Sequence, residues 1–473
     1  MKGFACLLLA ALPAFGADRS QPPKPGPARP LRLSALQELA LSNGLPVLLA
    51  ESHEVPVAEL LLVVRSGSAV DPGDRPGLAA MATGMLDEGA GGQDALALAD
   101  AIDFLGASLG ASSSWDASHV SLRVPVARLD AGLGLMADIA LRPDFPAREL
   151  ERLRKETLTR LLQARDQPAA VAGRALARAV FGDAHPYSRH PGGDTRSVSA
   201  ITVSDLQAFH ARHYRPENAA LVVVGDVTPA VLPLLERAFG TWAKADAASP
   251  PAIPEPPQVK GRRVWLVDRP GAAQSVIRIG RVGPRNPAPD QATLLVMNTL
   301  LGGSFTSRLN DNLREQHGYA YYARSGFDQR RVAGLFQAAA DVQTHSTAEA
   351  LGEFMRELRR IRTPAAPEEV ERARNYLALS YAENFETAGD VAGNLAEQWL
   401  YGLPADYFSA FVPKALAAGV GGVERAAAWI DTANLAIVVV GDRAKVEAKL
   451  RALNLGPLKL LSVDDVMGPA PQL

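Results

Sequence analysis

The sequence has one cysteine in 473 residues, and that cysteine, Cys6, lies in a short apolar run at the N-terminus. A basic start, apolar residues from Phe4 to Phe15 and small residues at Ala14 and Gly16 are typical of a secretory signal peptide. Cleavage near residue 17 would leave a mature chain without cysteine, which excludes disulfides and thiol chemistry. We expect residues 1–17 to be a signal peptide and the mature protein to lie in the periplasm or outside the cell.

The sequence also has almost no net charge, and it has no second long apolar run. With 49 basic and 51 acidic residues, the formal charge of −2 gives no general attraction to nucleic acid or to anionic membranes. After the N-terminal run, no apolar stretch approaches the length of a membrane-spanning helix. With 47% hydrophobic residues, the chain can bury a large core in two or more domains.

Two apolar stretches occur twice at nearly the same spacing. Val264–Val267 resembles Val47–Ala50 at an offset of 217 residues, and Val438–Asp442 resembles Val222–Asp226 at an offset of 216. Agreement of these offsets predicts an internal duplication. Strand-like and helix-like stretches show no regular βαβ alternation, which favours an α+β fold with mainly antiparallel sheets.

We therefore predict two homologous α+β lobes joined by a proline-rich linker. The expected divisions are a tether at 18–30, an N-terminal lobe at 31–242, a linker at 243–260, a C-terminal lobe at 261–460 and a tail at 461–473. Within the first lobe we expect helices at 77–88, 94–106, 148–164 and 169–180, and a strand at 112–126.

The stretch Gly77–Gly89 has the frame of a metal-binding helix but none of its ligands. In H-x-x-E-H helices two histidines bind zinc and the glutamate polarises a water molecule. The corresponding residues here are Ala80, Thr83 and Gly84. A tightly packed helix without a function is the simpler interpretation. Because glycine destabilises a helix interior, we also expect another helix or a bound chain to pass close to Gly84.

Further stretches, in a specific order, strengthen this likeness: Asp183–Tyr187 with Gly192-Gly193, His213–Asn218, and Gly302–Leu309 with Leu313–Tyr321. Together they resemble the pitrilysin, insulysin and mitochondrial processing peptidase family of zinc peptidases, the inverted zincins. The resemblance covers nearly all of residues 31–460. It implies two repeats of the family fold and an assembly that encloses unfolded or short peptides between lobes.

The resemblance also implies roles for particular residues. In two-subunit members one subunit carries the zinc helix, and the other contributes an Arg–Tyr pair that reaches the substrate; by motif these are Arg314 and Tyr321. The final zinc ligand, a glutamate about 75 residues after the second histidine, would fall at Thr159 or Arg160, and neither is acidic. The ordinary alternative for the pair is a helix cation and a core tyrosine, and we expect Arg308 to be structural.

The serine-rich stretch Ser112-Ser113-Ser114-Trp115 lies where this family keeps the edge strand that pairs with substrate backbone. Such an edge binds an extended peptide through main-chain hydrogen bonds. An ordinary solvent-facing strand is the alternative. The pairs His210 with His213 and His185 with His190 lack further ligands at suitable spacings, so we predict no metal in this chain and expect His185 to cap a turn.

The sequence thus predicts a zinc-free, non-catalytic subunit of a secreted two-subunit metallopeptidase. A homologous partner with an intact H-x-x-E-H motif would carry the zinc, and this chain would need no cofactor of its own. Two alternatives stay open: a non-enzymatic peptide-binding or scaffold protein, and a self-sufficient peptidase with an atypical metal site.

Overall fold

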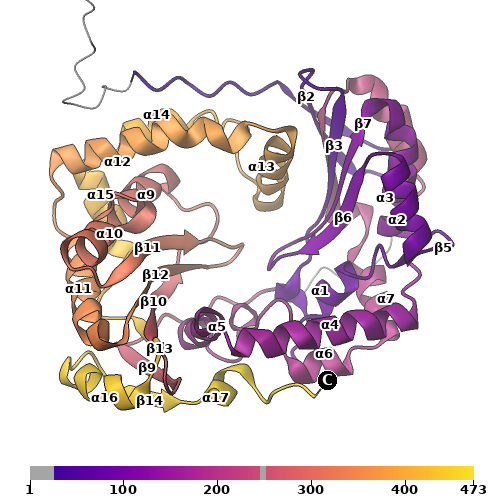
Figure 1. The fold of residues 1–473 in the computed structure, drawn as a ribbon. Helices are drawn as coiled ribbons and strands as arrows, with labels where there is room; N and C mark the ends of the chain where they lie inside the picture. Colours follow the sequence, from indigo (N-terminus) through magenta and orange to yellow (C-terminus); the bar gives the residue numbers. More distant parts are fainter. Residues whose placement is uncertain (1–25, 245–251, 473) are drawn as a thin grey trace, which may run out of the picture.

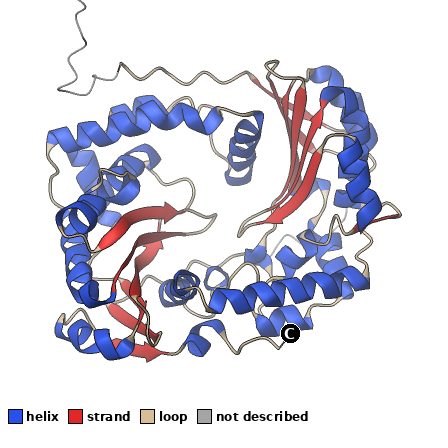
Figure 2. Cartoon of the chain, viewed as in Figure 1, coloured by secondary structure: helices blue, strands red, loops and turns tan. Residues whose placement is uncertain are grey.

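The computed structural model describes residues 26–244 and 252–472, so the expected signal peptide and part of the expected linker lie outside the described residues. Two six-stranded sheets, one in each half of the chain, stand in opposite halves of the molecule with helices around them (Figures 1 and 2). No helix in the described ranges is long and apolar enough to cross a membrane.

The first sheet has the strand order β1-β2-β8-β3-β7-β6. Its strands, in that order, are β1 (Leu36–Ala40), β2 (Pro46–Glu51), β8 (Ala219–Gly225), β3 (Val57–Val64), β7 (Ser118–Pro125) and β6 (Ser108–Ser113). Only β2 and β8 are parallel neighbours; the other pairs in this sheet are antiparallel. The short strands β4 (Gly89–Ala90) and β5 (Gln93–Asp94) form a separate pair.

The second sheet repeats this order as β11-β12-β10-β13-β9-β14. Its strands are β11 (Ala320–Asp328), β12 (Gly334–Gln343), β10 (Gln274–Gly283), β13 (Ala436–Gly441), β9 (Arg263–Asp268) and β14 (Leu458–Leu461). The parallel pair β9–β13 corresponds to β2–β8, and β11 takes the edge position of β6.

The two sheets share strand register as well as strand order. Glu51 pairs with Gly225 in the first sheet, and Asp268 pairs with Gly441 in the second. These residues are related by the offsets of 217 and 216 read from the sequence, so the predicted duplication and α+β fold are confirmed. Most neighbouring strands are antiparallel, as predicted, and the pairs β2–β8, β9–β13 and β9–β14 are parallel.

The helices of the first half match the predicted stretches at 94–106, 148–164 and 169–180. The stretch at 77–88 is helical only in its first part. They are α1 (Leu78–Thr83), α2 (Ala95–Phe104), α3 (Leu129–Leu141), α4 (Ala147–Arg165), α5 (Pro168–Phe181), α6 (Thr195–Ala200), α7 (Val203–His213) and α8 (Leu232–Phe239). The predicted helix at 77–88 is helical only to Thr83, because Gly84 ends it and turns follow.

The second half contains the remaining helices. They are α9 (Gln291–Asn298), α10 (Arg308–Asn310), α11 (Thr347–Arg360), α12 (Pro367–Ser380), α13 (Ala388–Tyr401), α14 (Phe411–Leu416), α15 (Val420–Ala426), α16 (Arg443–Ala452) and α17 (Val463–Met467), with π-helices η6 (Thr299–Gly303) and η7 (Asp311–Gln316).

Each half supplies one helix that covers the sheet of the other half. Helix α5 packs on β10 and β13 of the second sheet, and α13 packs on β8 and β3 of the first (Figure 1). One buried cluster joins Leu176 of α5 to Val438 of β13, and another joins Leu395 of α13 to Val222 of β8. Each half therefore has a core of its own, and two further buried clusters join the halves.

Candidate functional site

Helix α1 begins at a buried acidic cap. The carboxylate of Asp71 accepts hydrogen bonds from the backbone N–H of Gly77 (2.8 Å) and of Ala79 (2.9 Å). Gly77 has φ +93°, and a Cβ there would lie 2.8 Å from the backbone of Gly193, so this position requires glycine. Burial raises the pKa of Asp71 to about 7. The start of the helix is thus fixed by its own loop and by the Gly192-Gly193 turn.

Of the three residues in place of His, Glu and His, Thr83 and Gly84 have close partners, whereas Ala80 is partly exposed and lines the space beside the helix. The buried Thr83 hydroxyl donates to the carbonyl of Ala79 (2.8 Å) and lies 3.3 Å from the Tyr214 hydroxyl. Gly84 is the C-terminal cap of α1 rather than an interior residue. An added Cβ on Gly84 would lie 3.3 Å from Cδ2 of Leu153, so the close neighbour expected there is a side chain of α4.

On α4, the side that faces α1 carries no acid. The buried Thr157 lies with its hydroxyl 3.8 Å from Sδ of Met81, and Arg160 donates to the Thr157 hydroxyl (3.0 Å). The Thr159 hydroxyl instead donates to the Lys155 carbonyl (2.8 Å), and Thr159 does not line the space beside α1. Of the two positions predicted for the distal ligand, only Arg160 faces that space.

A cavity of about 670 Å³ occupies the space beside α1; we call it the α1 cavity. Its lining residues are Ala80, Met81, Thr83 and Gly84 of the α1 region, Ala111, Ser112 and Ser113 of β6, Leu153, Thr157, Arg160, Leu161 and Ala164 of α4, Ala170, Gly173 and Arg174 of α5, and His190 and Gly192. This lining contains one histidine and no carboxylate. Across residues 26–244 and 252–472, no group of three or more His, Cys, Asp or Glu residues is arranged to hold a metal ion.

The histidines singled out in the sequence serve the local structure. His185 accepts from the Tyr187 N–H (3.1 Å) and so caps its turn, as expected. His190 accepts from the Gly192 N–H (3.0 Å), and burial lowers its pKa to about 4. His213 lies 2.8 Å from the Ser66 hydroxyl, whereas His210 lies 2.9 Å from the Ala140 carbonyl. His213 and His210 therefore contact different groups.

The predicted edge strand is partly wrong. Ser112 and Ser113 lie on β6, at the edge of the first sheet. Ser114 and Trp115 lie in the turn to β7, so the single strand predicted for 112–126 is a hairpin. The turn forms because the Ser114 carbonyl accepts from Ser68 N–H (2.9 Å), and because the next residue, Asp116, is buried in a contact with the second half.

That contact centres on Asp116, a residue that the sequence did not single out. Its carboxylate accepts from the Tyr187 hydroxyl (3.0 Å), the Arg331 N–H (2.8 Å) and the Tyr401 hydroxyl (3.2 Å). Beside it, the guanidinium of Arg330 lies 4.1 Å from the ring centre of Trp115. The β6–β7 and β11–β12 turns occupy equivalent positions in the repeat, and their opposite charges were the available sequence signal.

Arg314 and Tyr321 come together on the second half. Arg314 lies in η7, and its guanidinium carbon is 5.4 Å from the ring centre of Tyr321 and 4.4 Å from that of Phe305. Tyr321 lies on β11, where a register shift between Ala320 and Ala323 marks a bulge, and it is 86% exposed. A guanidinium and a phenol held this way are hydrogen-bond donors presented at the edge of the sheet.

Arg308 is structural, as expected. Its guanidinium forms a two-pronged ion pair with Glu369, with distances of 3.0 Å from Nε and 2.7 Å from Nη2. This pair ties the short helix α10 to α12 and leaves Arg308 facing the protein rather than the solvent.

Comparison with known proteins agrees with this arrangement. The family model of insulinase (peptidase family M16) matches residues 46–190, and that of the peptidase M16 inactive domain matches residues 200–377. The chain is 28% identical to an uncharacterized zinc protease of Mycobacterium leprae over 63% of this chain and 67% of that protein. It is 24% identical to a non-peptidase homologue of Helicobacter pylori (80% and 87% covered) and 25% identical to a zinc protease of the same organism (76% and 82%).

Solved structures of M16 proteins have the same fold as this chain. A peptidase M16 inactive domain from Pseudomonas fluorescens superposes with a TM-score of 0.81 at 26% identity, covering 86% of this chain and 98% of that one. A protease from Helicobacter pylori has the same fold, with a TM-score of 0.79 at 21% identity over 86% of this chain and 100% of that one. The chain therefore belongs to the M16 family of peptidases, and it is similar in sequence and fold to inactive, non-peptidase members of that family.

Proposed function

We propose that this chain is the zinc-free subunit of a secreted two-subunit metallopeptidase. A homologous partner with an intact H-x-x-E-H helix would carry the zinc and the general base. This chain would form half of the chamber around an unfolded or short peptide. The N-terminal sequence, typical of a signal peptide, supports a location in the periplasm or outside the cell.

The observation that carries the proposal is the contrast between the two halves. In the first half, the residues beside α1 include one histidine and no carboxylate. In the second half, Tyr321 is 86% exposed and is backed by the guanidinium of Arg314. Phe305, which also contacts that guanidinium, is 58% exposed, and a group of exposed aromatic side chains is typical of a binding surface.

The chemistry assigned to the pair is hydrogen-bond donation. The Arg314 guanidinium and the Tyr321 hydroxyl would donate to the carbonyl oxygen of the peptide bond as negative charge develops on it. On the other half, the free edge of β6 at Ser112 and Ser113 would pair with the peptide backbone and hold it extended. Each contribution requires the partner to supply the attacking water.

A second candidate is a non-enzymatic peptide-binding or scaffold protein. It is favoured by the match to the Helicobacter pylori non-peptidase homologue, which extends over 87% of that protein. The same organism also has a zinc protease that resembles this chain, which fits either candidate.

Metal analysis and peptide cleavage distinguish the candidates. The purified mature chain is assayed alone and after mixing with a secreted homologue that has His, Glu and His in its helix; the neighbouring reading frames are the first place to look for it. Cleavage only after mixing supports the two-subunit peptidase, and no cleavage in either case supports the scaffold. Zinc bound to this chain together with cleavage by it alone would contradict both.

A further inference from the structure

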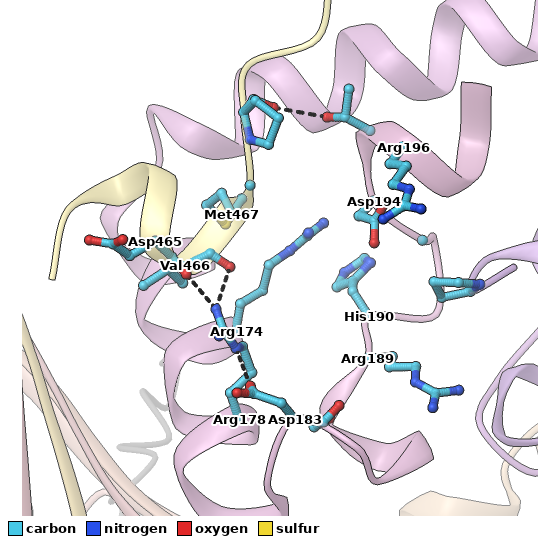
Figure 3. Close-up of a pocket in the computed structure, with 16 residues that line it drawn as sticks. Arg174, Arg178, Asp183, Arg189, His190, Asp194, Arg196, Asp465, Val466 and Met467 are labelled. Carbon is cyan, nitrogen blue, oxygen red and sulfur yellow. Dashed lines mark hydrogen bonds and ion pairs between the residues drawn. The ribbon is translucent and has the colours of Figure 1, made fainter. Parts of the chain in front are cut away.

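Two cavities of the first half meet at Arg174 of α5. One is the α1 cavity, and the other, of about 520 Å³, lies between α5, α6 and the C-terminal segment around α17. Arg174 and His190 line both. Figure 3 shows the Arg174 side chain extending into the space between Met467 and His190. The guanidinium is therefore placed where a bound molecule could reach it from either side.

Arg174 is a cation without a close counter-charge. Among the described residues, no carboxylate lies within 4 Å of it and no atom is hydrogen-bonded to its guanidinium; Asp194 acts on it only at longer range. Burial lowers the pKa of Arg174. The guanidinium lines two cavities and has no close protein acceptor among the described residues, so an anion that enters either cavity would form an ion pair for which no carboxylate of the chain competes.

The acids nearby are occupied, and none of them faces the α1 cavity. In the second cavity, Asp183 accepts from Arg178 (2.6 Å), Asp194 caps the Ser197 N–H (2.8 Å) and Asp465 caps the Ser462 N–H (2.7 Å).

The α1 cavity itself has two cations, Arg160 and Arg174, and no acid in its lining. The family resemblance would place an acidic zinc ligand beside this helix, whereas the lining of the cavity here is cationic.

The same cavity reaches the edge strand. Ser112 and Ser113 of β6 line it together with the two arginines, so a peptide paired to β6 would pass along its mouth. Guanidinium groups bind carboxylates with two parallel hydrogen bonds. We propose that the α1 cavity binds a carboxylate of an extended peptide that lies along β6, with Arg174 and Arg160 as the cationic ligands. This inference rests on the proposed function in that it needs a peptide on β6.

Peptide binding to the full mature chain tests the inference. The probe is a short unstructured peptide with an N-terminal fluorophore, made with a free or amidated C-terminus and with glutamate or glutamine at its centre. Fluorescence anisotropy should show that the wild-type chain binds at least one carboxylate form about tenfold more tightly than the fully neutral peptide. Comparing the singly charged forms shows whether the C-terminus or the side chain is recognised.

Variants test the assignment of the ligands. Arg174→Gln and Arg160→Gln should each reduce the preference for the carboxylate form while the neutral peptide binds as before. Lys155→Gln, which removes an exposed cation of α4 outside the cavity, should leave the preference unchanged. Circular dichroism of each variant confirms that the fold is retained.

Two results would overturn the inference: equal affinity of the wild-type chain for all peptide forms, or a preference that survives both arginine substitutions. Equal affinity would leave peptide binding at β6, and so the proposed function, intact. Failure of every peptide form to bind would contradict peptide capture at β6 as well.

Discussion

The guanidinium carbon of Arg314 lies 5.4 Å from the ring centre of Tyr321, although one residue ends a helix and the other begins a strand. Gly318, between them, has φ +65°, and its N–H donates to the Arg314 carbonyl (3.0 Å). The next N–H, of Tyr319, donates to the Leu313 carbonyl (2.8 Å). This helix ending turns the chain back on itself, so the backbone alone brings the two side chains together.

Removing either donor should lower turnover in the mixed assembly without preventing assembly. We expect Arg314→Ala or Tyr321→Phe to reduce kcat by about 10²-fold, the usual loss for a donor to a developing oxyanion. Steady-state kinetics with the zinc-bearing partner and gel filtration of the mixture measure the two effects. The matched control is Tyr322→Phe, the neighbouring tyrosine on β11, which should keep full activity. Full activity in both Arg314→Ala and Tyr321→Phe would refute the assigned role.

The contact around Asp116 should be a main source of stability between the halves. Asp116→Ala leaves the buried Tyr187 hydroxyl, the partly buried Tyr401 hydroxyl and the Arg331 N–H without their acceptor, so we expect the free energy of unfolding to fall by about 3 kcal/mol. Urea denaturation, followed by circular dichroism, measures this free energy of unfolding. Asp103→Ala, at an exposed position on α2, serves as the control and should change stability little. An equal, small effect of both substitutions would show that the contact is unimportant.

The acidic cap of α1 predicts a pH dependence of stability. Burial raises the pKa of Asp71 from its usual 3.8 to about 7, so the folded state binds this proton more tightly than the unfolded state does. Its contribution to stability is full below pH 3.8 and is lost as the pH rises through 7. At about 1.4 kcal/mol per pKa unit, the loss approaches about 4 kcal/mol.

The measurement for Asp71 is the difference in free energy of unfolding between the wild-type chain and Asp71→Asn at several pH values from 4 to 8. As the pH rises, the wild-type chain should lose stability relative to Asp71→Asn. A difference that stays constant across this range, or that shifts in favour of the wild-type chain, would show that Asp71 does not titrate as its burial predicts.

The exchange of α5 and α13 between the sheets predicts that the halves unfold together. Leu176 of α5 is fully buried, and a Cβ added to Gly280 of β10 would lie 3.1 Å from its Cδ2. We expect Leu176→Ala to lower the stability of both halves by about 3 kcal/mol in one transition. Thermal and urea unfolding, followed by separate probes in each half, test this, with the exposed Leu96→Ala as the control. Separate transitions for the two halves would show that the clusters joining them do not couple their unfolding.

The sequence predicts the repeat well because strand register depends on short apolar segments that the duplication preserved. The offsets of 217 and 216 correspond to the pairs Glu51–Gly225 and Asp268–Gly441 in the two sheets. The exchange of α5 and α13 could not be predicted in this way. An amphipathic helix pattern shows that one face is buried, but it does not show which sheet covers that face.

The site is predicted unevenly for a similar reason. Ala80 and Gly84 are visibly unable to bind zinc, and the ending of the helix at Gly318 follows from a local signal. Trp115 was placed on the edge strand because polar alternation continues through the turn. What makes that turn is the burial of Asp116, whose side-chain partners lie 71, 215 and 285 residues further along the chain. Contacts at such separations leave no periodic pattern in a single sequence.

We propose that this chain completes a peptidase whose zinc lies on another subunit. The most direct test is a titration in which a fixed amount of the zinc-bearing partner receives increasing amounts of this chain, and the initial rate of peptide cleavage is measured. We expect little cleavage by either chain alone, and a rate that rises and saturates near a one-to-one ratio of the two chains. A partner that is fully active alone, with a rate unchanged by this chain, would contradict it.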